Sequence, residues 1–378
     1  MKSQLLPEGF RDSLPDLAEL ENHITSIFID LMKFNGFQLV KPPLIEFESS
    51  LFFLKKHDSD NIDSFRVMDP LTQKIMGIRS DITLQIARVS CGSLSKNIRP
   101  LRLCYAGEVL KVKNNSINLS RQFTQVGAEI IGIQDHFCLS ELINLIIENL
   151  DKLGIKKFIL NFSMPNLINV IAKDFKLSKE QFDILVNCYR NKNLFEIKNI
   201  SEKLFQLSEF LLSSIGRIEE KIGYIKKYKF SKNIKSEVVP FIDQIKKIKD
   251  ELKNLDIIID PLEIDDSNYH SGFCFKVYSE NTKELFSGGG YKVGKENCIG
   301  FSGFLENLIF ESSIKMKKKI KIFIPFNLDL KKKNFLQKKK KLIIIRSIQK
   351  LNKDSFVKEA KKQDCQYYFY NNLINEVK

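Results

Sequence analysis

A glutamine and a glutamate lie four residues apart in a segment whose pattern is typical of a β-strand. Within residues 121–130, side chains of a strand alternate between two faces. Gln125, Gly127 and Glu129 then share one face, and the opposite face is mostly apolar. An amide and a carboxylate, with Gly127 between them leaving room for a ligand, suit recognition of a small amino or imidazole group. A solvent-facing sheet surface explains the same spacing equally well.

Other polar and aromatic residues are candidates for the same pocket. Asp81 and Thr83 stand at a predicted strand-to-helix junction, where capping of the helix is the simpler role. The segments 269–272 (YHSG) and 288–291 (GGGY) combine polar, aromatic and glycine residues. The glycine run is not a P-loop, because no Gly-Lys-Ser/Thr follows it. We find no convincing nucleophile–base pair, so a catalytic role for His270 is the less favoured interpretation.

The cysteines and histidines do not form a metal-binding pattern. The seven cysteines are scattered, none lies in a Cys-x-x-Cys pair, and the four histidines do not cluster with them. This argues against a zinc site and a disulfide framework, and favours free thiols in a reducing compartment. The chain has no apolar run long enough to cross a bilayer and no signal-peptide pattern. We therefore expect a cytoplasmic protein without metal or cofactor.

The 378-residue chain is basic, with a net charge of +14. Such a balance raises the hypothesis of a nucleic-acid partner. However, lysine, asparagine, isoleucine and phenylalanine are abundant throughout, as an AT-rich genome would produce. The basic runs 317–319, 331–333 and 338–341 lie late in the chain, beside turns and helix starts. We favour a solvated surface over a nucleic-acid footprint.

The apolar periodicity predicts helices and strands in the order of an α+β fold. Residues 13–35 are predicted to form an amphipathic helix that Gly36 ends, and 37–43 a short edge strand. Then follow a hairpin over 64–80, a helix after 81–83, strands at 101–112 and 121–132, a helix at 136–153 and a strand at 157–162.

The second half of the chain changes character twice. Residues 165–255 read as a helical insertion with lysine and glutamate faces. A hairpin over 272–290, closed by glycines 288–290, and a helix at 300–311 return to the first pattern. We therefore expect a core formed by 1–164 and 256–318, and a small C-terminal α/β module over 319–378, with three strands alternating with two helices.

At these residues the sequence resembles the histidyl-tRNA synthetases, and most closely their paralogues, the regulatory subunits of ATP phosphoribosyltransferase. The similarity covers roughly residues 5–311 and rests on several motifs in the right order. These are 6–12 (LPEGFRD), the first class II motif at 36–46 (GFQLVKPPLIE), 79–83 (RSDIT), the strand 125–129 (QVGAE) and the second histidine motif at 288–291. The resemblance implies a class II aminoacyl-tRNA synthetase-like antiparallel sheet flanked by helices, and a dimer interface at 36–46.

Three departures from the synthetase pattern concern arginines that stabilise the charge developing during adenylate formation. The aligned motifs place Ala106, Asp265 and Asn307 at arginine positions. Removing a single charge-stabilising donor typically costs about 10²–10³ in rate. The resemblance with these losses therefore implies a scaffold without adenylation activity.

The resemblance further implies a non-enzymatic subunit that activates the short-form catalytic subunit of ATP phosphoribosyltransferase and mediates feedback inhibition by histidine, in the first step of histidine biosynthesis. The expected partners are that catalytic subunit, a second copy of this chain within a hetero-octamer, and histidine as effector, without membrane or nucleic acid. The expected histidine-binding residues are Asp81, Thr83, Gln125, Glu129, Tyr269 and Tyr291. The alternatives are an active histidyl-tRNA synthetase and an RNA-binding synthetase paralogue.

Overall fold

The computed structural model describes residues 5–51, 64–112, 120–133, 135–252, 255–264, 270–316, 319–340 and 342–377. The chain divides into two compact units, Met1–Ile314 and Lys315–Lys378, called here the first and second units. Among the helices within these ranges, none is both long and apolar enough to cross a membrane.

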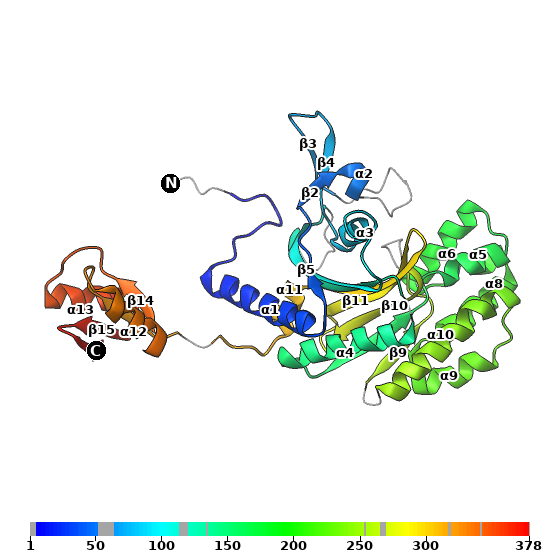
Figure 1. Cartoon of the computed structure of the whole chain (residues 1–378). Coiled ribbons are helices and arrows are strands. Elements are labelled where there is room, and N and C mark those ends of the chain that lie inside the picture. Colours follow the sequence, from blue (N-terminus) through cyan, green and yellow to red (C-terminus); the bar gives the residue numbers. More distant parts are fainter. Residues whose placement is uncertain are drawn as a thin grey trace. The chain divides into compact units, whose positions relative to one another are not determined.

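A nine-stranded sheet forms the centre of the first unit, in the order β1-β5-β6-β12-β11-β10-β7-β9-β8 (Figure 1). Its strands are β1 (Gln38–Leu39), β5 (Leu101–Leu110), β6 (Gln122–Ile131), β7 (Phe158–Ser163), β8 (Gly216–Arg217), β9 (Ile257–Asp260), β10 (His270–Ser279), β11 (Glu284–Val293) and β12 (Glu296–Phe304). Neighbours from β5 to β7 are antiparallel, whereas β1 pairs with β5 and β7 with β9 in parallel. The expected α+β fold with an antiparallel sheet is confirmed for the central strands, and the parallel pairs make the whole sheet mixed.

Helices cover both faces of the sheet around β5 and β6 (Figure 1). On one face, alternate residues such as Cys104 and Ala128 pack in the cluster that includes side chains of α1 (Pro15–Phe34), α4 (His136–Lys152) and α11 (Leu305–Glu311). On the other face, Leu103, Tyr105 and Phe123 pack with side chains of α3 (Thr83–Cys91). The face that carries Gln125 and Glu129 is therefore buried, and the solvent-facing alternative is wrong.

The helix α1 confirms the prediction for residues 13–35. Pro15 occupies its first position, where a missing backbone N–H costs nothing. Of the apolar residues at three- and four-residue spacing, Ile24, Phe28, Leu31 and Met32 are buried. Gly36 follows with a φ of +82°, a left-handed conformation that favours glycine. The short strand β1 follows directly and lies at the sheet edge, as predicted.

A separate three-stranded sheet follows β1 in the chain and lies above the large sheet in Figure 1. It consists of β2 (Ile45–Phe47), β4 (Ile75–Ile78) and β3 (Arg66–Met68), next to the one-turn helix α2 (Glu48–Leu51). The pairing of β3 with β4 from Arg66↔Gly77 to Met68↔Ile75 confirms the hairpin predicted over 64–80.

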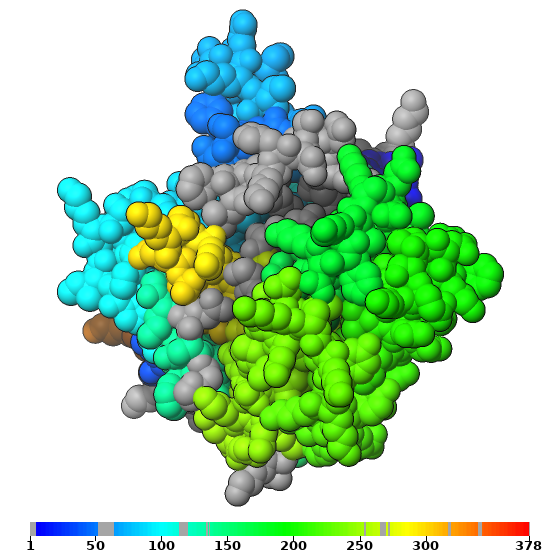
Figure 2. Space-filling view, turned by 90° about the vertical axis from the view of Figure 1, so that its right-hand side faces the viewer, coloured from blue at the N-terminus to red at the C-terminus, as the bar shows by residue number. Residues whose placement is uncertain are grey.

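Helices fill the range predicted to be a helical insertion. They are α5 (Leu167–Asp174), α6 (Lys179–Asn191), α7 (Ile197–Ile200), α8 (Glu202–Ser213), α9 (Ile218–Lys227) and α10 (Lys232–Glu251). Among the described residues of this range, the two-residue strand β8 interrupts the helices and extends the large sheet through β9. Figure 2 shows these helices, in green, forming much of one face of the first unit.

Two predictions in the second half of the core are wrong. Glycines 288–290 do not close a hairpin but lie inside β11, which continues to Val293. The predicted helix at 300–311 is helical only from Leu305, because residues 296–304 form β12 between β6 and β11. This strand is buried on both faces, so its sequence lacks the alternation of apolar and polar residues by which a half-buried strand is recognised.

The second unit contains a four-stranded sheet in the order β14-β13-β15-β16. Its elements are β13 (Lys321–Ile324), α12 (Leu330–Lys340), β14 (Ile343–Arg346), α13 (Lys353–Lys362), β15 (Tyr367–Tyr370) and β16 (Leu373–Glu376). The predicted alternation of strands and helices is present, and β16 is an additional strand. Leu336 of α12 packs with Ile322 and Ile324, whereas Phe356 of α13 packs with Phe323, so the two helices cover opposite faces.

Candidate functional site

Glu129 lies in the middle of β6 and is the centre of a buried hydrogen-bond network. Its side chain is 1% exposed. Its Oε1 accepts a hydrogen bond from the Tyr105 hydroxyl on β5 (3.2 Å), and its Oε2 accepts one from the Tyr291 hydroxyl on β11 (2.9 Å). Tyr291 can be reached across β12 because Gly300 lies directly opposite Glu129, and a Cβ there would overlap the carboxyl group.

Burial sets the ionisation of this network. It raises the pKa of Glu129 to about 8, while the hydrogen bond from Tyr291 acts in the opposite direction. Burial also raises the pKa of Tyr105 and of Tyr291 above the usual range of tyrosine, so both hydroxyls keep their protons as donors. The site therefore contains a carboxyl group that changes charge near neutral pH.

Gln125 and Asp81 are bonded to each other and to the start of α3. The Gln125 side chain donates from Nε2 to Asp81 Oδ1 (2.9 Å) and accepts from the Ile82 backbone N–H at Oε1 (2.8 Å). Asp81 Oδ1 also accepts from the Thr83 backbone N–H (2.9 Å) at the first residue of α3, although the N-cap position itself is Ile82, which has no side-chain capping bond. These bonds hold the first turn of α3 against β6.

Thr83 joins this pair of residues to the glutamate. Its Oγ1 lies 2.9 Å from the Tyr105 hydroxyl, which in turn contacts Glu129. The structure thus brings together five of the six residues predicted for the site: Asp81, Thr83, Gln125, Glu129 and Tyr291. The sixth, Tyr269, lies outside the described residues.

Tyr105 is the site residue that the sequence analysis missed. It pairs with Gly127 across β5 and β6, and a Cβ on Gly127 would overlap its hydroxyl. The prediction that Gly127 leaves room for a ligand is therefore wrong, because the tyrosine side chain fills that room. The register between the two strands would have revealed the contact, but neither strand alone shows it.

A small cavity opens beside Glu129, on the side toward β10, β11 and β12. It is lined by Thr83, Glu129, His270, Ser287, Gly288, Gly289, Tyr291, Gly300, Phe301 and Ser302. No lysine or arginine is among the lining residues that the structure describes. Within those same parts of the chain, no three His, Cys, Asp or Glu residues cluster as a metal site would require. The lining suits a small polar ligand that offers hydrogen-bond donors to the carboxyl group.

Ala106 does not face this cavity. It pairs with Val126 on the sheet face toward α1 and α4, whereas its neighbours Tyr105 and Gly107 are on the face of Glu129. Its identity therefore does not decide whether a cation is present at the site, and the interpretation of Ala106 as a lost catalytic arginine is wrong. A substitution that removes an arginine from the cavity must lie on the other face of the strand.

The arginine that does lie over Gly107 is held by structural contacts. Arg79 donates from Nε to the carbonyl oxygen of Glu108 (2.7 Å), and from Nη1 to that of Pro42 (2.9 Å) and to Gln85 Oε1 (3.3 Å). A Cβ on Gly107 would overlap its guanidinium group. These hydrogen bonds connect the segment before α3 to β5, so Arg79 has a structural role.

Of the other two positions that align with synthetase arginines, the structure describes one. Asn307, in the first turn of α11, donates from Nδ2 to the carbonyl oxygen of Glu284 (2.8 Å), so this side chain supplies a neutral link to β11. Asp265 lies outside the described residues.

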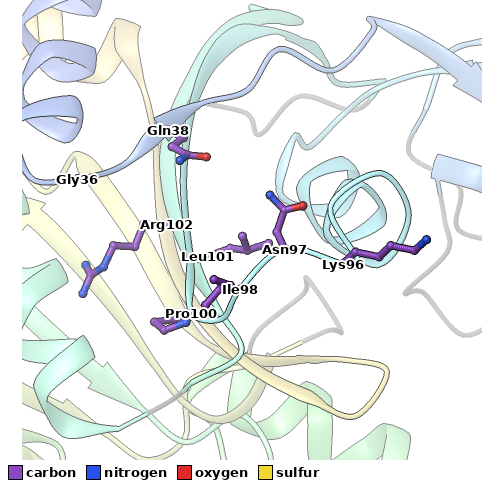
Figure 3. A pocket seen from close by; sticks show the side chains of 8 residues that line it. All are labelled: Gly36, Gln38, Lys96, Asn97, Ile98, Pro100, Leu101 and Arg102. Carbon is purple, nitrogen blue, oxygen red and sulfur yellow. The ribbon is translucent and has the colours of Figure 1, made fainter.

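A second and larger pocket lies at the β1 edge of the sheet (Figure 3). It is lined by Gly36, Gln38, Lys96, Asn97, Ile98, Pro100, Leu101 and Arg102. Figure 3 shows the Lys96 and Arg102 side chains pointing in opposite directions. Arg102 is paired with Glu141 of α4, so the two cations do not converge on one ligand position. The exposed side chains of Leu39 and Ile98 make this edge partly apolar.

The fold of the chain matches proteins of the histidyl-tRNA synthetase class. A family model described as histidyl-tRNA synthetase matches residues 9–308. A solved Bacillus halodurans structure, titled as an ATP phosphoribosyltransferase regulatory subunit/histidyl-tRNA synthetase, superposes with a TM-score of 0.77 at 20% identity, covering 95% of this chain and 97% of the other. Histidyl-tRNA synthetase from a Nostoc species gives 0.74 at 16% identity, covering 97% and 91%.

Comparison of the sequences identifies one family within this class. The chain is 31% identical, over 81% of both sequences, to a Paramagnetospirillum magneticum protein named ATP phosphoribosyltransferase regulatory subunit. A Rhodospirillum rubrum protein of the same name is also 31% identical, over 81% of this chain and 80% of its own. The chain therefore belongs to the family of ATP phosphoribosyltransferase regulatory subunits, whose fold is that of the class II histidyl-tRNA synthetases.

Proposed function

We propose that this chain is the non-catalytic regulatory subunit of a cytoplasmic ATP phosphoribosyltransferase. It activates the short-form catalytic subunit and mediates feedback inhibition by histidine in the first step of histidine biosynthesis. The observation that carries the proposal is the 31% identity over 81% of both chains with a relative of that name.

The surroundings of Glu129 support the absence of adenylation. A synthetase must stabilise negative charge on phosphate oxygens, which requires fixed cations or donors at the reacting atoms. The described cavity lining has neither lysine nor arginine, Arg79 is occupied by structural bonds, and Asn307 bonds a backbone carbonyl. Among the described residues, the cavity lining offers groups that can hold a small polar molecule, and its lack of lysine and arginine supports the proposal that the chain does not activate ATP.

The proposed effector site is the network of Asp81, Thr83, Gln125, Glu129 and Tyr291, with Tyr269. In this proposal the α-ammonium group of histidine donates to the Glu129 carboxylate, which must release its proton to form the ion pair. Charge-assisted hydrogen bonds of this kind contribute about 1.5–3 kcal/mol each. Histidine then inhibits only if it binds one assembly state more tightly than another.

The β1 edge is the proposed dimer surface within the hetero-octamer. β1 has a strand neighbour on one side only among the described elements, and Leu39, Leu44 and Ile98 are 40%, 42% and 91% exposed. Exposed apolar side chains at and near a sheet edge favour contact with another protein surface.

The experiment that tests the function combines this chain with its short catalytic subunit. We expect a rise in phosphoribosyltransferase activity, a larger complex by light scattering, and inhibition by histidine only in the complex. No stimulation and no co-elution at any salt concentration would contradict the proposal. The alternative of an active synthetase, which the description of the family model keeps open, would show histidine-dependent exchange of pyrophosphate into ATP.

The effector site has its own test. Glu129→Gln keeps the shape of the side chain and should weaken histidine binding to the complex about tenfold or more by calorimetry. Glu108→Gln is the matched control, because Glu108 lies on the opposite sheet face, where its Oε1 accepts from Thr124 Oγ1 (2.8 Å). Unchanged affinity in Glu129→Gln would place the effector site elsewhere without affecting the subunit assignment.

A further inference from the structure

The net charge of the chain resides entirely in the second unit. Residues 315–378 contain 19 Lys and Arg against 5 Asp and Glu, which is +14, whereas residues 1–314 contain 41 of each. A uniform excess of lysine from genome composition would have charged both units. The explanation of the basic balance by overall composition is therefore insufficient, because acidic residues match the lysines of the first unit and not those of the second.

Of the two helices in the second unit, α12 carries the larger excess of positive charge. The α12 sequence, LKKKNFLQKKK, contains six lysines and no acidic residue. Leu336 fixes the helix to the sheet at 1% exposure, while Lys331, Lys332 and Lys338 are exposed. In α13, on the other face, four lysines accompany Asp354 and Glu359, and Lys362 pairs with Glu359. Like charges placed this densely on one helix repel each other and are stabilised by a polyanion.

The composition of this surface distinguishes between polyanions. Eighteen of the nineteen basic residues of the second unit are lysine, and α12 has six lysines and no arginine. Lysine acts as a point charge for phosphate, and it is depleted in protein–protein interfaces, which disfavours an acidic protein as partner. A membrane-surface helix needs one continuous apolar face, but the lysines at 331, 332 and 333 occupy three successive directions around α12. Phe335, 47% exposed, adds an aromatic ring between the two lysine runs.

We infer that Lys331, Lys332, Lys333 and Lys338 of α12 form a docking surface for a nucleic-acid strand, bound through its phosphate backbone without base specificity. Lysines that neutralise phosphates release counterions, and an interspersed aromatic ring offers a base a stacking partner. This surface lies beyond the residues that the family model matches, 9–308, and the inference does not depend on the proposed regulatory function.

Fluorescence anisotropy of the full chain with a labelled 20-nucleotide single-stranded RNA, at increasing salt, tests the inference. We expect tight binding at low salt and affinities within about threefold for shuffled sequences. A variant with Lys331, Lys332, Lys333 and Lys338 changed to glutamine should bind about tenfold or more weakly. The slope of log affinity against log salt should fall by about 3, since each backbone contact to a single strand contributes about 0.7.

The matched control removes the same charge from the first unit. It changes four exposed lysines of α9 and α10, Lys227, Lys235, Lys246 and Lys247, to glutamine. This control should bind like the wild type, and circular dichroism should show both variants folded. Equal loss in both variants, or no binding at low salt, would overturn the inference. The inference would also be overturned if polyglutamate or phosphatidylserine vesicles displaced the labelled RNA as well as unlabelled RNA does at an equal concentration of charge.

Discussion

Replacing Glu129 with glutamine should change how the stability of the first unit depends on pH. The buried carboxyl has a pKa of about 8 in the folded state against 4.5 ordinarily. A carboxyl with a raised folded pKa favours the folded state fully below pH 4.5, and that contribution is lost as pH rises toward 8. In this window the unfolded chain releases the proton while the folded chain keeps it.

The magnitude follows from the size of the shift. Between pH 5 and pH 7.5, the Glu129 carboxyl lowers the free energy of unfolding by about 1.4 kcal/mol for each pH unit, or about 3 kcal/mol in total. The glutamine amide does not titrate in this pH range, so this dependence of the free energy of unfolding on pH is absent in the variant. The amide also fits the network, because Tyr291 still donates to its oxygen and Tyr105 can donate to Thr83 while accepting from the amide nitrogen.

Urea denaturation followed by circular dichroism, at one protein concentration and several pH values, measures this difference. Glu306 also has its pKa raised by burial, to about 7, so the wild type alone does not isolate Glu129. The difference in the free energy of unfolding between Glu129→Gln and the wild type does isolate Glu129. This difference should increasingly favour the variant as pH rises from 5 to 7.5. Parallel pH dependences of the two proteins would refute the reasoning.

Two further substitutions test the packing around the glutamate. Gly300→Ala should lower the free energy of unfolding by about 1–3 kcal/mol in chemical denaturation, because the new methyl group overlaps the Glu129 carboxyl. Gly223→Ala, within α9 and with open space around the new methyl group, is the control and should stabilise by about 0.5–1 kcal/mol. Tyr105→Phe should cost about 1–3 kcal/mol in the same assay, since Thr83 and Glu129 each lose a buried partner; a neutral result would contradict the network.

The local pattern of apolar and polar residues was enough to predict an element wherever that element is amphipathic or bounded by strong turn residues. The helix α1 has an early proline, a spaced apolar stripe and a final glycine, and its extent was predicted within two residues. Strands β5 and β6 were also predicted, and their alternation correctly put Gln125 and Glu129 on one face. The local pattern did not predict β12, because this strand is buried on both faces. Its last five residues, GFSGF, also include two glycines and one serine.

The sequence by itself determined the alternation of Gln125 and Glu129, the basic composition and the order of elements, because these depend on neighbours along the chain. Only the tertiary structure decided that Tyr105 fills the space at Gly127, that Ala106 faces away from the cavity, and that Tyr291 reaches the glutamate across Gly300. Each of these depends on the pairing register of strands far apart in the chain, and a shift of one residue would reverse every side-chain direction. The division of charge likewise became visible only once the boundary between the two units was located at residue 314.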